Sequence, residues 1–356
     1  MAIMITKPHN IYIHVPFCKA RCNYCAFFSQ ACANPDWDTY TNGIIRELES
    51  WNKRLGCISV PTIFFGGGTP SYMPGAIFGQ IMDAIAKNFD IDAGAEITAE
   101  CNPGTIDKEK LKEFIAAGMN RISIGVQRLD DNELKFMGRI HNTHDAMQLI
   151  DLAMSQKLRV SADFIYGIPG DTAQNVAKMC TEINKIGLQH CSMYELSIEA
   201  GTPFASANLT MPGNEEMAQM YSVIGTELNL PRYEVSNHAA DGNECRHNQN
   251  IWDGAPYIGI GRGAAGRVYI DGTWYEQMGA GQTFRQMTLR DRAVEKIITG
   301  MRTTRGVQLT PDVAMYIDMG YIAMHPELIS VTDDGRIVAT DMGILILDKI
   351  LLELIR

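Results

Sequence analysis

Short apolar runs alternate with longer amphipathic stretches from Ile11 to Leu196. The runs are rich in β-branched and aromatic residues, which favours strands over buried helix segments. Six strands are predicted, at Ile11–Val15, Thr62–Phe65, Glu96–Ala99, Arg121–Val126, Arg159–Tyr166 and His190–Leu196.

The stretches between these runs repeat their apolar residues at helical spacing. Five helices are predicted, at Pro35–Lys53, Gly75–Asn88, Lys108–Ala117, Thr143–Gln156 and Ala173–Ile186. Asp107 and Asp171 precede two of them as candidate caps. A strand–helix alternation indicates parallel strands with helical crossovers. Because six units fall short of the eight of a closed barrel, the prediction is an α/β fold with a partial (β/α)6 TIM-like barrel.

The alternation ends after Glu199. The sequence then predicts an amphipathic helix over 211–228, a strand over Tyr233–Ala239 and a helix over 289–302. A hairpin is expected around Asp334-Gly335, followed by one amphipathic helix over 342–356. We therefore expect a barrel over 1–200, a barrel-extending segment over 201–285 and a small α+β C-terminal domain over 286–356.

Three cysteines follow the first strand with the spacing C-x-x-x-C-x-x-C, namely Cys18, Cys22 and Cys25. No single face of a helix or strand presents all three, so a loop around a metal group is expected. Thiolates are the usual ligands of iron–sulfur clusters, and three of them leave one iron of a 4Fe–4S cluster open. A structural zinc ion would need a fourth ligand such as His14 or Cys32, and disulfides would need an oxidising compartment.

Polar and glycine residues gather at the ends of the later strands, where α/β barrels build their sites. A glycine turn can bring backbone close to a ligand, although it can also be a plain turn. Carboxylate, amide and guanidinium groups suit a zwitterionic ligand, although each taken singly could be a cap or a structural ion pair. The candidates are Gly67, Gly68, Thr69, Glu100, Gln127, Arg139 and Asp163.

The run YIHVPFCKARCNYCAFF resembles the opening of radical S-adenosylmethionine (SAM) enzymes, in the branch of the oxygen-independent coproporphyrinogen III oxidase. The third cysteine is followed by Ala26-Phe27, whereas the oxidase pattern places a fourth cysteine there. The pattern C-x-x-x-C-x-x-C-x-F is similar to the haem-chaperone relatives of the HemW type. The resemblance extends from Ile11 to the helical tail.

This resemblance implies a three-quarter barrel and a 4Fe–4S cluster on Cys18, Cys22 and Cys25. In the family, SAM chelates the open iron, and one electron cleaves it to a 5′-deoxyadenosyl radical. The glycine turn, Glu100, Gln127, Arg139 and Asp163 match positions that contact SAM or a second SAM. Tyr12 and Tyr24 flank the cysteines and are expected either to cover the cluster or to lie in the core.

The run YEVSNHA…HNxxxW…YIGIGxGA matches the family over the C-terminal half, and the tail resembles its winged-helix-like domain. His247 is the candidate haem ligand, in a stretch expected to be exposed and glycine-rich; the alternative is an ordinary hydrogen-bonding surface histidine. Ile251 replaces the family tyrosine, and a family histidine is missing from 261–266, so His238 and Cys245 are kept as further candidates. The glycines of 259–263 lack a Rossmann context, so dinucleotide binding is rejected.

Composition narrows the function classes. With 356 residues, 46% of them hydrophobic, the chain can bury a large core. Its 31 Lys and Arg against 41 Asp and Glu give a net charge of −10, which argues against nucleic acids and anionic membranes as main partners. No signal peptide or apolar run of membrane-spanning length is visible, so a cytoplasmic protein is expected. Cys57, Cys180 and Cys191 are expected to be buried thiols.

Three functions remain open. The first is a haem chaperone that binds a 4Fe–4S cluster, SAM and haem and delivers haem to a recipient haemoprotein. The second is oxidative decarboxylation of coproporphyrinogen propionates, so whether the chain is an enzyme stays open. The third is a zinc-stabilised binding module. The missing fourth cysteine favours the first.

Overall fold

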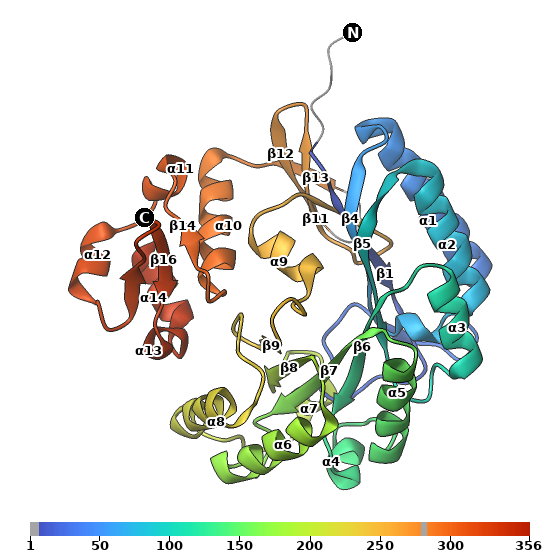
Figure 1. Cartoon of the computed structure of the whole chain (residues 1–356), viewed down its shortest axis with the longest axis horizontal. Coiled ribbons are helices and arrows are strands. Elements are labelled where there is room, and N and C mark those ends of the chain that lie inside the picture. Colours follow the sequence, from blue (N-terminus) through green and yellow to red (C-terminus); the bar gives the residue numbers. More distant parts are fainter. Residues whose placement is uncertain (1–6, 279–282) are drawn as a thin grey trace.

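The centre of the molecule is a curved sheet whose middle strands are all parallel (Figure 1). This computed structural model describes residues 7–278 and 283–356. The six predicted strands are present and pair in chain order, which confirms the partial α/β barrel. They are β1 (Asn10–Val15), β4 (Ser59–Gly67), β5 (Asp90–Cys101), β6 (Arg121–Gln127), β7 (Arg159–Tyr166) and β8 (His190–Glu195).

The five predicted helices cover the outer face of this sheet (Figure 1). They are α1 (Trp37–Leu55), α2 (Gly75–Asn88), α3 (Lys108–Ala116), α5 (Thr143–Ser155) and α6 (Ala173–Ile186). Their buried faces pack on the outward side chains of the strands; Phe78 and Phe114, for example, stack with ring centroids 4.1 Å apart. A short helix after β6, α4 (Asp131–Phe136), was not predicted.

One of the two predicted helix caps is wrong. Asp107 caps α3 by accepting the Lys110 N–H, as expected. At the start of α6, however, Thr172 is the cap. The carboxylate of Asp171 turns inward and pairs with buried Arg128 instead.

Residues after Glu199 extend the sheet at both edges. On one edge β10 (Tyr257–Ile260) pairs in parallel with β1, and β11 (Gly266–Ile270), β12 (Thr273–Met278) and β13 (Thr283–Gln286) continue it antiparallel. On the other edge β9 (Asn237–Ala239) pairs antiparallel with β8. The helices of this part are α7 (Pro203–Ser206), α8 (Asn214–Glu227), as predicted, and α9 (Arg246–Trp252).

The strand predicted over Tyr233–Ala239 is correct only for its last three residues. Upstream, the N–H groups of Tyr233 and Glu234 both point to the carbonyl oxygen of Asn237, and the Glu234 carboxylate accepts from the Ser236 N–H at 2.7 Å. These local bonds replace the ladder that a strand would need.

A second hydrophobic core lies in the C-terminal part, around side chains such as Ile297, Ile337 and Leu354. A three-stranded sheet of β14 (Val307–Gln308), β16 (Arg336–Ala339) and β15 (Ile329–Val331) contains the predicted hairpin. The helices around it are α10 (Leu289–Met301), α11 (Pro311–Ala314), α12 (Met319–Met324), α13 (Asp341–Ile344) and α14 (Leu347–Leu354).

The prediction of one continuous last helix is wrong, because α13 and α14 are separate. Gly343 lies against the backbone of Leu328, where a Cβ would come within 2.0 Å of the carbonyl oxygen. Cys57 also differs from its prediction: it is exposed in the connection after α1, whereas Cys180 and Cys191 are buried. Among the described helices, none is both long enough and apolar enough to cross a bilayer.

Candidate cluster and cofactor site

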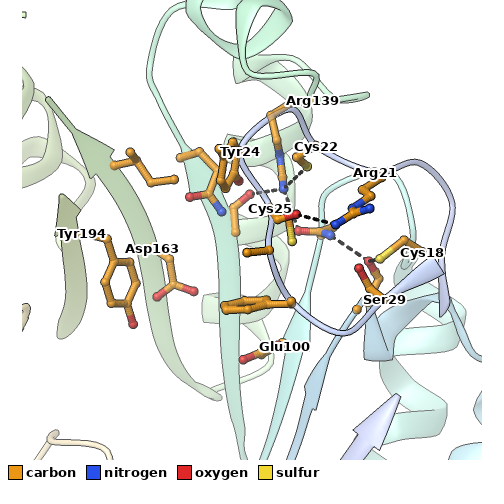
Figure 2. Close-up of a pocket in the computed structure, with 18 of the residues that line it drawn as sticks. Cys18, Arg21, Cys22, Tyr24, Cys25, Ser29, Glu100, Arg139, Asp163 and Tyr194 are labelled. Atoms are coloured by element: carbon orange, nitrogen blue, oxygen red, sulfur yellow. Dashed lines mark hydrogen bonds between the residues drawn. The ribbon is translucent and has the colours of Figure 1, made fainter. Parts of the chain in front are cut away.

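A pocket of about 370 Å³, here called the outer pocket, opens at the carboxyl ends of the parallel strands (Figure 2). It brings together every candidate cluster and SAM residue except Tyr12, whereas the haem-ligand candidates His247, His238 and Cys245 do not line it. Those that line it are Cys18, Cys22, Tyr24, Cys25, Gly67, Gly68, Thr69, Glu100, Gln127, Arg139 and Asp163. Ser123 and Tyr194 complete its deeper wall.

The cysteine loop is held at both ends by a short parallel pair, β2 (Phe17–Cys18) and β3 (Gln30–Ala31). Cys18 is buried, whereas Cys22 and Cys25 are half-buried and face the pocket. None of the nine cysteines is in a disulfide. Over residues 7–278 and 283–356, no group of three or more His, Cys, Asp or Glu side chains lies close enough together to hold a single metal ion.

Hydrogen-bond donors reach two of the three sulfurs. The Thr69 hydroxyl donates to Cys18 Sγ at 3.4 Å, and the Arg139 Nη1 donates to Cys22 Sγ at 3.4 Å. Burial raises the pKa of the Cys18 and Cys25 thiols, which disfavours thiolates in the free protein. A cationic metal group would reverse this penalty, and donors on sulfur are a known means of tuning cluster potential. The residues therefore fit an iron–sulfur group.

Neither nearby candidate for a fourth ligand joins the three cysteines. His14 is bonded through both ring nitrogens, with Nε2 2.8 Å from the Phe28 carbonyl oxygen and Nδ1 3.1 Å from the Tyr12 hydroxyl. Cys32 does not line the pocket. Cys101, directly after Glu100, also lines the outer pocket, but its thiol is buried and donates to the Ala99 carbonyl oxygen at 3.7 Å. The donor set of the cysteine loop is thus three sulfurs.

The turn after β4 requires glycine because it lies close against the cysteine loop and the end of β1. Gly67 has a φ of 113°, and a Cβ there would lie 2.6 Å from the His14 ring. A Cβ on Gly68 would lie 3.0 Å from Cys18 Sγ. The Gly68 N–H donates to the Val15 carbonyl oxygen at 2.7 Å, which fixes the turn against the start of the loop.

Asn102 is a site residue that sequence reasoning missed. Its Oδ1 accepts from Arg139 Nη2 at 2.6 Å, and its Nδ2 donates to Thr69 Oγ1 at 3.1 Å. It therefore connects the donors on Cys18 and Cys22. Its place two residues after Glu100, at the end of the same strand, was the available signal.

Gln127 is in an uncommon backbone conformation, with a φ of 72°. The β6–β7 pairing shifts register between Gly125 and Gln127, so a bulge redirects the chain at the pocket rim. A Cβ on Gly125 would lie 2.6 Å from Asn102 Oδ1. Local strain of this kind is retained mainly where a binding site needs it.

Two carboxyl groups with raised pKa values face the deeper wall. Burial, and then the neighbouring charge of Asp163, raise the pKa of Glu100 to about 8, although Glu100 accepts the Gly67 N–H at 3.1 Å. Burial also raises the pKa of Asp163, whose oxygens accept from Ser123 at 3.1 Å and Ser192 at 2.8 Å. Tyr194 is 41% exposed, and Figure 2 shows its ring directed into the same space.

The raised pKa of Glu100 predicts a pH dependence of stability. The folded protein keeps this proton up to about pH 8, whereas the unfolded chain loses it near its ordinary value of 4.5. The free energy of unfolding should therefore fall as pH rises through this window. In Glu100→Gln that component is absent, so the difference in stability, Glu100→Gln minus wild type, should grow from pH 5 to pH 8. Urea unfolding of both metal-free proteins at several pH values measures it, and a constant difference would contradict the assignment.

Tyr12 and His247 line a second cavity of about 260 Å³, here called the inner pocket. It shares four residues with the outer pocket, namely Glu100, Ser123, Asp163 and Tyr194. The prediction of an exposed glycine-rich stretch around His247 is wrong. His247 is on α9, is 2% exposed and stacks on Phe64 with ring centroids 5.1 Å apart.

The hydrogen-bond pattern determines which His247 nitrogen carries the proton. Asn10 Nδ2 donates to the Pro256 carbonyl oxygen at 3.1 Å, so its Oδ1 accepts the Thr62 hydroxyl proton at 2.8 Å. Thr62 Oγ1 must therefore accept from His247 Nδ1 at 2.7 Å. Burial lowers the pKa of His247 to about 4, so the ring is neutral near pH 7. Its Nε2 has a free lone pair and no hydrogen-bond partner in the described structure.

The two further haem-ligand candidates lie elsewhere. His238 is on β9, with Nδ1 3.2 Å from the Leu230 carbonyl oxygen, and Cys245 donates to Glu96 at 3.7 Å. Both are buried, and neither lines the inner or outer pocket.

The fold and the site together define a class: an α/β partial barrel with a three-cysteine loop at its mouth. The family description "Radical SAM superfamily" matches residues 12–183. The relative named "Radical S-adenosyl methionine domain-containing protein 1, mitochondrial" from Danio rerio is 31% identical over 96% of this chain and 86% of its own length. "Heme chaperone HemW" of Escherichia coli is 34% identical over 73% of this chain and 70% of its own length.

A solved structure has the same fold over nearly the whole chain. The coproporphyrinogen III oxidase HemN of Escherichia coli aligns with a TM-score of 0.82, covering 98% of this chain and 90% of that chain, at 19% identity. The chain belongs to the radical SAM superfamily and, within it, to the coproporphyrinogen oxidase-like family of the haem-chaperone type. The family implies a 4Fe–4S cluster and SAM as cofactors, and the three-sulfur pocket fits both. Such a cluster supplies one electron to SAM when both are bound.

Proposed function

We propose that this chain is a haem chaperone that uses the cluster and SAM site to hold haem and deliver it to a recipient haemoprotein in the cytoplasm. The observation that carries the proposal is its 34% identity to a protein named as a haem chaperone, against 19% to the solved oxidase. Ala26-Phe27 after Cys25, where the oxidase pattern has a fourth cysteine, supports the same choice.

The site residues take the following proposed roles. Cys18, Cys22 and Cys25 hold three irons of the cluster, and Thr69 and Arg139 donate hydrogen bonds to two of the sulfurs. The backbone of Gly67 and Gly68, with Glu100, Gln127 and Asp163, binds the polar groups of SAM from the strand ends. Tyr24 covers the cluster side of the outer pocket, whereas Tyr12 is placed at the inner pocket.

We propose His247 as the haem ligand because its Nε2 is unprotonated and has a free lone pair, as a nitrogen that binds haem iron must. The ring is 2% exposed, so contact with iron requires α9 to move away from β4. A neutral histidine with a lowered pKa is suited to ligation at neutral pH, since no proton has to leave.

A haem titration of the anaerobically reconstituted protein tests the proposal. We expect a shifted Soret band in the wild type that is lost in His247→Ala and kept in His325→Ala, an exposed histidine of the C-terminal part. An unshifted Soret band in the wild type would contradict haem binding.

The second candidate function is oxidative decarboxylation of coproporphyrinogen, which the shared fold with the solved oxidase favours. Incubation of the reconstituted protein with SAM, a reductant and coproporphyrinogen distinguishes the two. Decarboxylated product would favour the oxidase, and its absence together with haem binding would favour the chaperone.

A further inference from the structure

The inner pocket contains a buried cation without an ion-pair partner. Arg121 begins β6, is 2% exposed and lines the inner pocket. Within residues 7–278 and 283–356 its guanidinium forms no salt bridge and donates no hydrogen bond; its interactions with Cys245, Glu96, Tyr233 and Asp163 are through-space only. A buried charge without a partner is costly, so this position is suited to an anion.

The nearest carboxylates already have donors of their own. Glu96 accepts from Arg159 at 2.7 Å and from the backbone N–H of His247 at 2.9 Å. Asp163 accepts from the hydroxyls of Ser123 and Ser192. Both lie close enough to act on Arg121 through space, but neither forms a salt bridge or hydrogen bond with it in the described structure.

The inner pocket is small and has room for one polar side chain and water. Its volume of about 260 Å³ is below the about 300–1,000 Å³ of typical ligand sites, so it suits a small acid or one side chain of a larger ligand. The free lone pair of His247 Nε2 can accept a hydrogen bond from water that accompanies this side chain, because a carboxylate itself has no proton to donate. Glu100 and Asp163 also line this pocket, and burial raises the pKa of both, which favours their neutral form; an anionic group is therefore expected at Arg121.

The inner pocket continues into the outer pocket along one strand face. Alternate residues of β6 face the barrel interior, with Arg121 at its start, Ser123 in the middle and Gln127 at the mouth. Ser123 lines both pockets, whereas Gln127 lines only the outer one. A side chain bound at Arg121 therefore lies directly beneath the SAM site.

We propose that the inner pocket receives one propionate side chain of the tetrapyrrole and pairs its carboxylate with the Arg121 guanidinium. This inference rests on the proposed function, because haem and coproporphyrinogen both carry propionates. A guanidinium binds a carboxylate through two parallel N–H···O bonds, which gives orientation as well as affinity. Arg121 would thereby fix which edge of the macrocycle enters the barrel.

The test is a comparison of haem with haem dimethyl ester, which lacks the carboxylates. Soret titrations are made on the reconstituted wild type, Arg121→Gln, Arg121→Lys and the control Arg302→Gln, which removes a half-exposed cation paired with Glu234. We expect the wild type to prefer haem by about tenfold or more, as for a charged hydrogen bond. Arg121→Gln should bind both compounds equally, whereas Arg121→Lys and Arg302→Gln should keep a preference for haem. Thermal unfolding of each variant confirms that it folds.

Full retention of the preference in folded Arg121→Gln would overturn the inference while leaving haem binding intact. If the wild type binds neither compound, the proposed function fails. The same comparison with coproporphyrin and its tetramethyl ester then decides whether Arg121 recognises a carboxylate. A loss of preference in Arg302→Gln equal to that in Arg121→Gln would contradict a specific role of Arg121.

Discussion

Serine at Cys18, Cys22 or Cys25 is expected to abolish bound iron in anaerobically reconstituted protein. Each cysteine supplies one of the three sulfurs of the loop. His14 is bonded elsewhere, and Cys101, which also lines the pocket, is buried with its thiol bonded to the Ala99 carbonyl oxygen, so neither is placed to replace a lost ligand. Loss of one ligand leaves two irons of the cluster without protein ligands. Iron analysis and the visible absorption of the cluster measure the effect.

Cys57→Ser and Cys180→Ser are the matched controls. Cys57 is exposed after α1, and Cys180 is buried in α6, outside both pockets. Both variants should bind as much iron as the wild type. Full iron content in any of the three loop variants would remove that cysteine from the site.

The largest loss of stability is expected for Asp171→Ala. The Asp171 carboxylate accepts from Arg128 at 2.9 and 3.0 Å and from the N–H groups of Gly167 at 2.8 Å and Ile168 at 3.1 Å. Both members of the pair are almost fully buried. Removing the carboxylate leaves two N–H groups without partners and takes the buried ion-pair partner from a guanidinium that keeps only Glu133 and the Ile165 carbonyl oxygen, which costs about 3 kcal/mol or more. Urea unfolding of the metal-free protein measures this cost.

Asp107→Ala is the control, because Asp107 is an exposed cap of α3 and its loss should cost about 1 kcal/mol. The Arg128–Asp171 pair follows Gln127 and joins the ends of β6 and β7, so we also expect weaker SAM binding in Asp171→Ala. Equal costs for the two alanine variants would contradict the account of the buried pair.

The barrel could be predicted from the sequence because each parallel strand is buried and reads as an apolar run bounded by polar residues. Strand order then followed from the alternation with helices, and the site from the rule that strand ends meet at one edge. The cysteine loop and the glycine turn could be found in the sequence for a different reason, because these residue types have few other uses at those positions.

What the sequence did not reveal depends on side-chain direction. Asp171 has the residue type and position of a helix cap, but Arg128 lies within reach in space and not in sequence. Asn102 acquires its role from contacts with Thr69 and Arg139, which come from two other segments. His247 was expected to be exposed because its neighbours are polar, yet β4 and Phe64 bury it.

The electrostatics of the two pockets differ in a way that matches the proposed roles. The outer pocket has donors on two sulfurs and two carboxyl groups of raised pKa, which suit a positively charged, zwitterionic cofactor. The inner pocket shares these two carboxyl groups and adds a guanidinium without a salt bridge, which suits an acid, and a neutral histidine. Glu100 and Asp163 lie between the two pockets, so a cationic ligand in the outer pocket and an anionic ligand in the inner pocket would be neighbours.

The central claim is that three sulfurs leave one iron of the cluster open for SAM. The most direct measurement is the electron paramagnetic resonance spectrum of the reduced, reconstituted protein before and after addition of SAM. The account predicts that SAM changes the g values of the cluster signal in the wild type. An identical spectrum with and without SAM, or a protein that retains one zinc ion and no iron, would contradict it.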